Sequence, residues 1–146
     1  MRGRRLARRL ALDVLYEAEI KDVLPLDAYD AHVREGWVPD GDASAEHSEE
    51  VLSYARALVA GVQRHHADID ALIASYADRW AIKRMPVVDR NLLRLSIYEL
   101  LWGDDVPVAV AINEAVELAK TLSTDDSGRF INGLLGHIVE DRKIVP

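Results

Sequence analysis

Apolar residues recur at helical spacing from the start of the chain. Leu6, Leu10 and Val14 fall on one side of a helix at about 100° per residue, which predicts an amphipathic helix over residues 4–21. We expect this helix to bury its aliphatic side and to present the opposite side to solvent. That opposite side is a basic arc made of Arg4, Arg5, Arg8 and Arg9, together with Leu12 and Tyr16.

The same spacing predicts further helices along the rest of the chain. The helix that follows Pro86 is apolar almost all round, which is typical of a helix packed on several sides and places it at the centre of the fold. No stretch keeps the two-residue alternation of a half-buried strand. We therefore predict a compact all-α bundle of about seven helices in a single domain, residues 1–146. The other predicted helices begin near residues 25, 48, 68, 107 and 128, and the glycine-containing segment 36–47 is predicted to be a loop.

Motifs typical of enzymes and metal centres are missing from the sequence. There is no cysteine, no Gly-x-Ser-x-Gly elbow and no Ser-x-x-Lys pair. His65 and His66 are adjacent, so on a helix they diverge by about 100° and cannot readily hold one ion. Asp125 and Asp126 are interpreted as charges that favour a helix start. We therefore expect no enzymatic activity, no metal and no cofactor.

Gly133 and Gly136 form a Gly-x-x-Gly pattern within the last predicted helix. No strand precedes them and no Lys-Ser or Lys-Thr follows, so a phosphate-binding loop is not indicated. The pattern instead favours close packing of another helix against these glycines, and the same explanation is expected for Gly61.

Charge is distributed unevenly along the chain. The formal net charge is -7, yet five arginines precede the first acidic residue, Asp13. The first dozen residues therefore carry +5 and the remainder -12. A concentrated cationic end favours an anionic partner, with nucleic acid as the first candidate. A cleaved targeting peptide would need a separate apolar segment after the arginines, and none follows.

The overall composition favours a protein of the cytoplasm. Hydrophobic residues make up 49% of the chain, which is enough for a core of ordinary size. No apolar run approaches the roughly 20 residues that a membrane-spanning helix needs. The lack of cysteine also excludes a disulfide framework of the kind that secreted proteins use.

Two aromatic residues are candidates for an RNA-binding surface, Phe130 by stacking on the bases of single-stranded RNA and Tyr16 at the edge of the surface. Phe130, the single phenylalanine, follows a polar break at the start of the last helix. Its place in the sequence is compatible with burial in the core and with exposure for base stacking. Tyr16 lies on the basic arc, where a core position and the edge of a binding surface both fit.

Several segments resemble the NusB family of transcription antitermination factors. Segment 89–100 resembles the central helix of the family, and the arginine-rich start resembles its first helix. The resemblance covers nearly the whole chain, and the loop 36–47 fits it least. The most specific matches are 106–120 (VPVAVAINEAVELAK), 125–127 (DDS) and 130–135 (FINGLL).

The resemblance implies an all-helical fold of two three-helix-like halves and no enzymatic activity. It implies that the chain binds boxA, a single-stranded element of ribosomal RNA transcripts, as a heterodimer with NusE, a small-subunit ribosomal protein. Such a heterodimer joins elongating RNA polymerase and other Nus factors in a complex that suppresses termination. Self-association as a homodimer stays open.

The resemblance also assigns roles to individual residues. The positions expected to contact RNA phosphates are Arg4, Arg5 and Arg8. The second RNA-facing edge is expected to consist of Asp126, Ser127 and Phe130. The positions at or near the NusE interface are Tyr16 and Asp89, of which Asp89 is expected to pair with a basic side chain. One RNA strand is expected to lie along both RNA-facing edges.

Two alternative functions remain compatible with the residues. The same helical module resembles the N-terminal part of ribosomal RNA cytosine methyltransferases, where it would dock RNA for an enzyme. The chain ends at Pro146 without a strand-rich cofactor domain, which favours a stand-alone factor. A helical adaptor that binds only proteins would leave the arginines as a solvated end, and the RNA affinity of arginine variants separates this alternative from the first interpretation.

Overall fold

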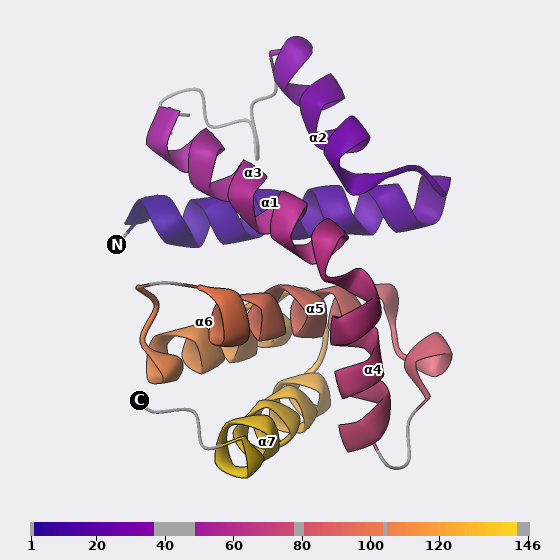
Figure 1. Ribbon diagram of the computed structural model, residues 1–146, viewed down its shortest axis with the longest axis vertical. Coiled ribbons are helices and arrows are strands. Elements are labelled where there is room, and N and C mark those ends of the chain that lie inside the picture. Colours follow the sequence, from indigo (N-terminus) through magenta and orange to yellow (C-terminus); the bar gives the residue numbers. More distant parts are fainter. Residues whose placement is uncertain (1, 37–48, 78–80, 104, 143–146) are drawn as a thin grey trace. The chain divides into compact units, whose positions relative to one another are not determined.

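The computed structural model describes residues 2–36, 49–77, 81–103 and 105–142, so the predicted loop 36–47 lies outside the described residues apart from Gly36. Within these ranges all regular secondary structure is helical, which confirms the all-α prediction (Figure 1). The elements are α1 (Arg2–Lys21), α2 (Pro25–Arg34), α3 (Glu49–Arg64), α4 (His66–Tyr76), the short 3-10 helix η2 (Ile82–Arg84), α5 (Val87–Trp102), α6 (Val108–Leu122) and α7 (Asp125–Asp141).

The chain divides into two compact units, residues 1–64 and 65–146. In the described ranges the first unit contains α1, α2 and α3, as the resemblance to a three-helix-like half implies. The second unit contains one α-helix more than that expectation, because α4, α5, α6 and α7 all belong to it. The prediction of a single domain stays a prediction.

The first unit is built on α1, because α2 and α3 both pack against it (Figure 1). The predicted aliphatic side of α1 is buried at Leu10 and Val14, which are 0% and 1% exposed. Tyr29 of α2 is also buried, and its hydroxyl donates a 2.6 Å hydrogen bond to the carbonyl oxygen of Leu52 on α3. Pro25 begins α2 as predicted, since the first turn of a helix does not use the N–H that proline lacks.

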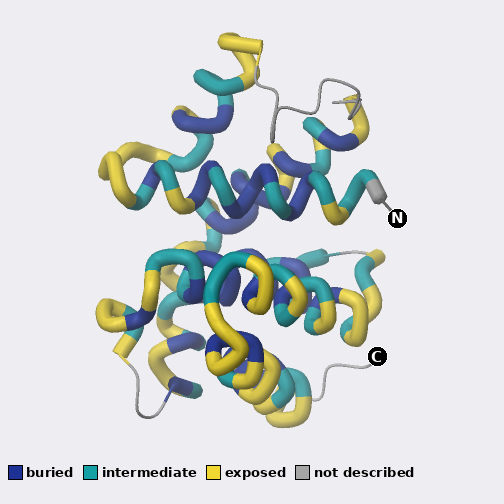
Figure 2. The backbone as a smooth tube through the Cα atoms, turned by 180° about the vertical axis from the view of Figure 1, so that it is seen from behind, coloured by how far each residue is buried: buried dark blue, intermediate teal, exposed yellow. Residues whose placement is uncertain are grey.

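The predicted basic arc of α1 is only partly exposed. Arg8 is 4% exposed and Leu12 is 2% exposed, although both belong to this arc. The prediction that the arginines of the arc all face solvent is therefore wrong for Arg8. Helical periodicity fails here because it assumes one buried face, whereas α1 has buried residues on more than one side, as the burial along the tube indicates (Figure 2).

The centre of the second unit is α5, against which α4, α6 and α7 all pack. Leu92 and Ile97 are 0% exposed, which confirms the central position that the apolar pattern predicts for this helix. An ion pair joins α5 to α4: the Arg94 guanidinium donates hydrogen bonds of 2.8 and 2.9 Å to the two carboxylate oxygens of Asp70. This bidentate geometry holds the two helices in one register.

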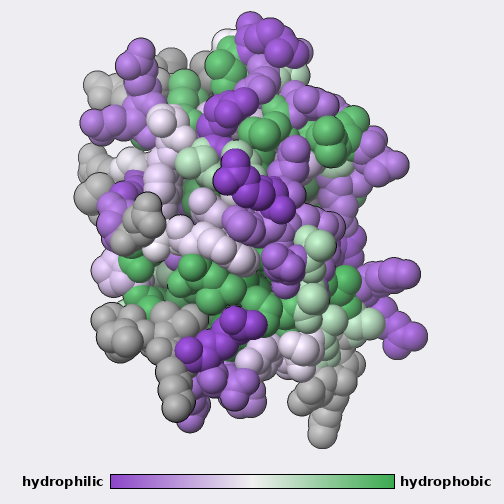
Figure 3. All heavy atoms as spheres, in the orientation of Figure 1, coloured by the Kyte–Doolittle hydropathy of each residue, from purple (hydrophilic) through white to green (hydrophobic). Residues whose placement is uncertain are grey.

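Apolar side chains also reach the surface of the second unit. They gather over α6 on the face shown in Figure 3, and Val110 of α6 is 42% exposed. None of the described helices is both long enough and apolar enough to cross a membrane.

The glycines of α7 do not all serve helix packing. A β-carbon added at Gly133 or Gly136 would meet nothing within 4 Å, so the prediction of close packing at these two residues is wrong. The close approach lies at Gly128, where an added β-carbon would stand 3.3 Å from Cγ of Lys120 on α6. Sequence spacing does not show which side of a helix meets a neighbour when small residues lie on both sides. Gly61 of α3 is buried, as close packing requires.

We expect Gly133→Ala to raise the free energy of unfolding by about 0.5–1 kcal/mol. The added methyl group enters open space, and alanine loses less backbone entropy than glycine when the helix forms. Chemical denaturation measures the change. Gly128→Ala is the matched control in the same helix, and it should stabilise less because Lys120 must move. An unchanged or lower stability for Gly133→Ala would contradict the expectation.

Candidate nucleic-acid interface

The arginines at the start of α1 form the first part of the candidate interface. Arg5 is exposed, Arg4 and Arg9 are half-buried, and Arg8 is buried. Arg9 also pairs with Asp13 one turn further on, with Nε 3.3 Å from Oδ1. Of the three predicted phosphate contacts, Arg4 and Arg5 are therefore the two that a ligand in solvent can reach. Their positive charges favour a polyanion through the release of its counterions.

Tyr54 of α3 lies beside Arg4, and helical periodicity does not single it out. The guanidinium carbon of Arg4 lies 4.6 Å from the centre of the Tyr54 ring, within the range of a cation–π interaction. Tyr54 follows Val51 by three residues and precedes Leu58 by four, and both of these residues are buried. Its spacing is therefore that of a core residue, and only the contact between two helices reveals its place beside a basic side chain.

The predicted second edge lies at the start of α7. Thr124 caps this helix, because its Oγ1 accepts a 3.0 Å hydrogen bond from the backbone N–H of Ser127. Asp126 is exposed and forms an ion pair with Arg129 in the next turn. Phe130 is half-buried, so part of this residue reaches the surface. The start of α7 therefore presents an acidic, a basic and an aromatic side chain close together in sequence.

Two of the predicted site residues are buried and contact each other. Ser127 Oγ donates a 2.6 Å hydrogen bond to Oδ2 of Asp89, which joins the start of α7 to the first turn of α5. Asp89 is 0% exposed and Ser127 is 5% exposed. The expected ion pair between Asp89 and a partner protein does not fit this burial, nor does direct contact of RNA with the Ser127 side chain. An acidic residue in a first helical turn is often a surface residue, and its long-range partner is not visible in the sequence.

Tyr16 lies on an exposed apolar strip at the end of α1. It is 42% exposed, and Ile20 in the next turn is 60% exposed. Between them, Glu17 contacts His32 of α2 at 2.6 Å and Lys21 at 3.3 Å. Burial raises the pKa of Glu17, the hydrogen bonds to His32 and Lys21 lower it, and the net shift is downward. Glu17 is therefore ionised at neutral pH, and the strip offers a partner an apolar surface beside a carboxylate.

The histidines and acidic residues do not form a metal centre in the part of the chain that the structure describes, since no group of three or more potential ligands is close enough to hold an ion. His65 stacks on Trp102 of α5, with ring centroids 3.9 Å apart and an interplanar angle of 10°. This histidine therefore has an aromatic contact within the second unit.

The candidate residues are divided between the two units. The arginines and Tyr16 belong to the first unit, and Asp89, Asp126, Ser127 and Phe130 belong to the second. The expectation that one RNA strand lies along both edges spans the two units, so it stays a prediction.

Comparison with known proteins identifies close relatives over nearly the whole chain. The profile of the NusB family matches residues 5–140. A transcription antitermination protein NusB from Salinispora arenicola is 50% identical over 140 residues, which cover 96% of this chain and 97% of that protein.

Solved structures give the same relationship. A solved structure described as T. maritima NusB superposes with a TM-score of 0.81 at 33% identity, covering 94% of this chain and 91% of that chain. A chain from a crystal structure of the antitermination factors NusB and NusE in complex with double-stranded RNA superposes with a TM-score of 0.80 at 28% identity. That match covers 97% of this chain and 98% of that chain.

Proposed function

This chain belongs to the NusB family, and from that membership we propose that it is a transcription antitermination factor. In this function it binds the boxA element of ribosomal RNA transcripts as a heterodimer with NusE. The heterodimer then joins other Nus factors on elongating RNA polymerase in the cytoplasm. The observation that carries the proposal is the 50% identity to a NusB protein over 96% of this chain and 97% of that relative. The solved complex of a related chain with NusE and RNA supports the two partners.

The RNA contacts follow from the exposure of the candidate residues. We assign the phosphate contacts to Arg4 and Arg5, which solvent reaches, and a supporting role to the buried Arg8. At the start of α7, Phe130 offers a ring for base stacking and Asp126 offers hydrogen-bond acceptors. The work of this protein is therefore binding and positioning of RNA, with no catalytic step.

A binding titration tests the proposed function. Fluorescently labelled boxA-like RNA is titrated with the protein, with and without NusE, and a scrambled RNA of equal length is the control. We expect modest affinity for the protein alone, because a short basic arc makes few phosphate contacts, and higher affinity with NusE. Equal affinity for boxA-like and scrambled RNA in the presence of NusE would contradict the proposal and favour an adaptor that binds only proteins.

We expect Tyr16→Ala to weaken association with NusE about tenfold, as the loss of a partly exposed aromatic anchor does at many interfaces. The phenol ring lies on the exposed strip of α1 and contributes apolar area to a partner surface. Isothermal titration calorimetry with purified NusE measures the affinity. Val33→Ala removes an equally exposed apolar side chain from α2 and is the control. Unchanged association of Tyr16→Ala would remove Tyr16 from the interface.

A further inference from the structure

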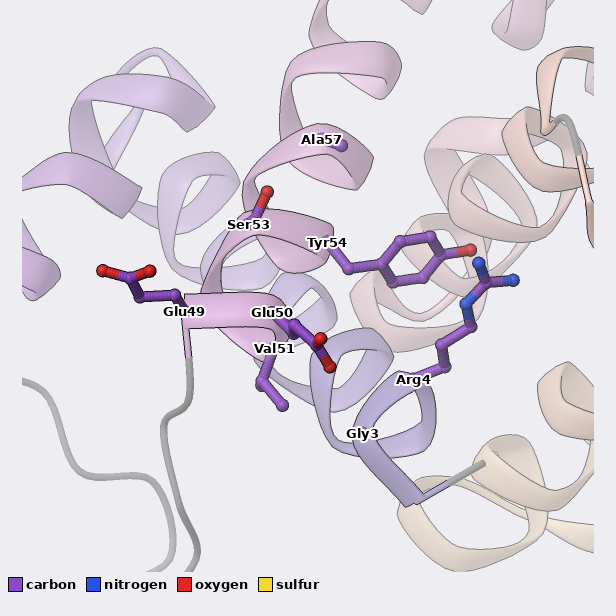
Figure 4. A pocket seen from close by; sticks show the side chains of 8 residues that line it. All are labelled: Gly3, Arg4, Glu49, Glu50, Val51, Ser53, Tyr54 and Ala57. Atoms are coloured by element: carbon purple, nitrogen blue, oxygen red, sulfur yellow. The ribbon is translucent and has the colours of Figure 1, made fainter.

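A cavity in the first unit opens between the starts of α1 and α3 (Figure 4). Its volume is about 630 Å³, within the range of pockets that hold small ligands. Of the residues that the structure describes, Gly3 and Arg4 line it from α1, and the other lining residues belong to α3. The lining residues on α3 are Glu49, Glu50, Val51, Ser53, Tyr54 and Ala57.

The wall of this cavity carries two planar groups. The Arg4 guanidinium and the Tyr54 ring project toward the same space in the close view, and they lie 4.6 Å apart (Figure 4). Nucleobases stack on tyrosine rings and on arginine guanidinium planes in complexes with single-stranded RNA. The cavity therefore has the surfaces that a flat, uncharged aromatic ligand requires.

The acidic residues of the wall decide which part of a nucleotide enters. Glu50 points toward α1 at Gly3, whereas Glu49 points away from the other labelled side chains (Figure 4). A carboxylate repels a phosphate group, but it accepts hydrogen bonds from the amino group of a base. A base thus fits this cavity, and the phosphate of the same nucleotide remains outside it on the basic side of α1, where Arg5 is exposed.

We propose that this cavity is a binding site for one nucleobase of the single-stranded RNA. The inference rests on the proposed function, which supplies the RNA. The base stacks against the planar pair formed by Arg4 and Tyr54, and Glu50 accepts a hydrogen bond from its exocyclic amino group. The site therefore selects adenine, cytosine or guanine over uracil, which has no amino group.

Tyr54→Leu tests the site, because leucine keeps apolar volume in the wall and removes the ring. We expect about tenfold weaker binding of boxA-like RNA in the presence of NusE, the size of effect that loss of one base–aromatic stack produces. The slope of log affinity against log salt should stay that of the wild type, since no charge is lost. Tyr54→Phe keeps the ring and should bind as the wild type does.

A set of RNAs, each with one abasic nucleotide, distinguishes stacking from a change in structure. At one position, removal of the base should weaken the binding of the RNA to the wild-type protein. Removal of the same base should not weaken binding to Tyr54→Leu any further, because the base and the Tyr54 ring interact with each other. Ala57→Met narrows the cavity from an exposed position of its wall, and it should weaken binding even if Tyr54→Leu does not fold. Circular dichroism establishes that each variant is folded.

Three results overturn the inference. The first is that Tyr54→Leu and Ala57→Met both bind boxA-like RNA with wild-type affinity. The second is that Tyr54→Leu loses the same affinity, relative to the wild-type protein, for every abasic RNA. In either case the wild type still prefers boxA-like RNA to the scrambled control, so the proposed function stands without this site. The third is a wild type that does not distinguish the two RNAs, in which case the proposed function fails and the inference fails with it.

Discussion

Arg5→Glu will weaken the binding of boxA-like RNA about tenfold or more at low salt. Arg5 is the exposed arginine of the basic arc, so the substitution replaces an attractive charge with a repulsive one without opening a core. The slope of log affinity against log salt should also fall by about one, because fewer counterions are released from the RNA. Fluorescence titrations at several salt concentrations, with NusE present, measure both quantities.

Arg64→Glu is the matched control for this prediction. Arg64 is exposed at the end of α3 in the same unit, and its substitution changes the net charge by the same amount. If both variants lose affinity equally, the effect comes from net charge and the phosphate contact assigned to Arg5 is wrong. Arg8→Glu is a poor test by comparison, since Arg8 is 4% exposed and a glutamate there disturbs the interior.

Asp89→Lys will lower the free energy of unfolding by about 3 kcal/mol or more, the cost of an uncompensated charge in the interior. Asp89 is 0% exposed, and its Oδ2 accepts the hydrogen bond of Ser127. Its Oδ1 is buried with no hydrogen-bond partner in the described part of the chain. A lysine at this position loses the acceptor and brings an ammonium group next to a serine hydroxyl. Chemical denaturation followed by circular dichroism measures the loss.

Glu117→Lys is the control, because it makes the same change of charge at an exposed position of α6. It should leave the free energy of unfolding within about 0.5 kcal/mol of the wild type. If Asp89→Lys proves as stable as this control and still fails to bind NusE, then Asp89 acts at the interface, and its hydrogen bond to Ser127 does not contribute the expected stability.

Most of the helices could be predicted from local patterns. Pro25 and Pro107 precede or begin helices because proline is compatible with a helix start, and the all-round apolar character of α5 reports its central position. The assignment of the site was less complete. Arg5 and Tyr16 are exposed as a binding role requires, but Arg8 is buried, since periodicity assumes that a helix is covered on one side only.

Two features of the site depend on residues far apart in the sequence, and the packing of the glycines in α7 depends on a neighbouring helix. Asp89 contacts Ser127, and Tyr54 lies beside Arg4 across two helices. Gly133 has open space at its β-carbon position, whereas Gly128 in the same helix meets α6. The spacing of residues along one helix does not show which group a polar side chain contacts. It also does not show whether a neighbouring helix packs against a glycine.

The order of residues along the chain was thus sufficient for the helical class, for the cationic amino terminus and, through its motifs, for the family. Each of these properties depends on neighbours within a few turns or on the identity of the residues themselves. Tertiary packing alone decided which arginine a ligand reaches, that the Asp89 carboxylate supports α7, and that a cavity lies beside Tyr54. These properties arise where helices meet, because burial and hydrogen bonding are determined by atoms that distant segments bring together.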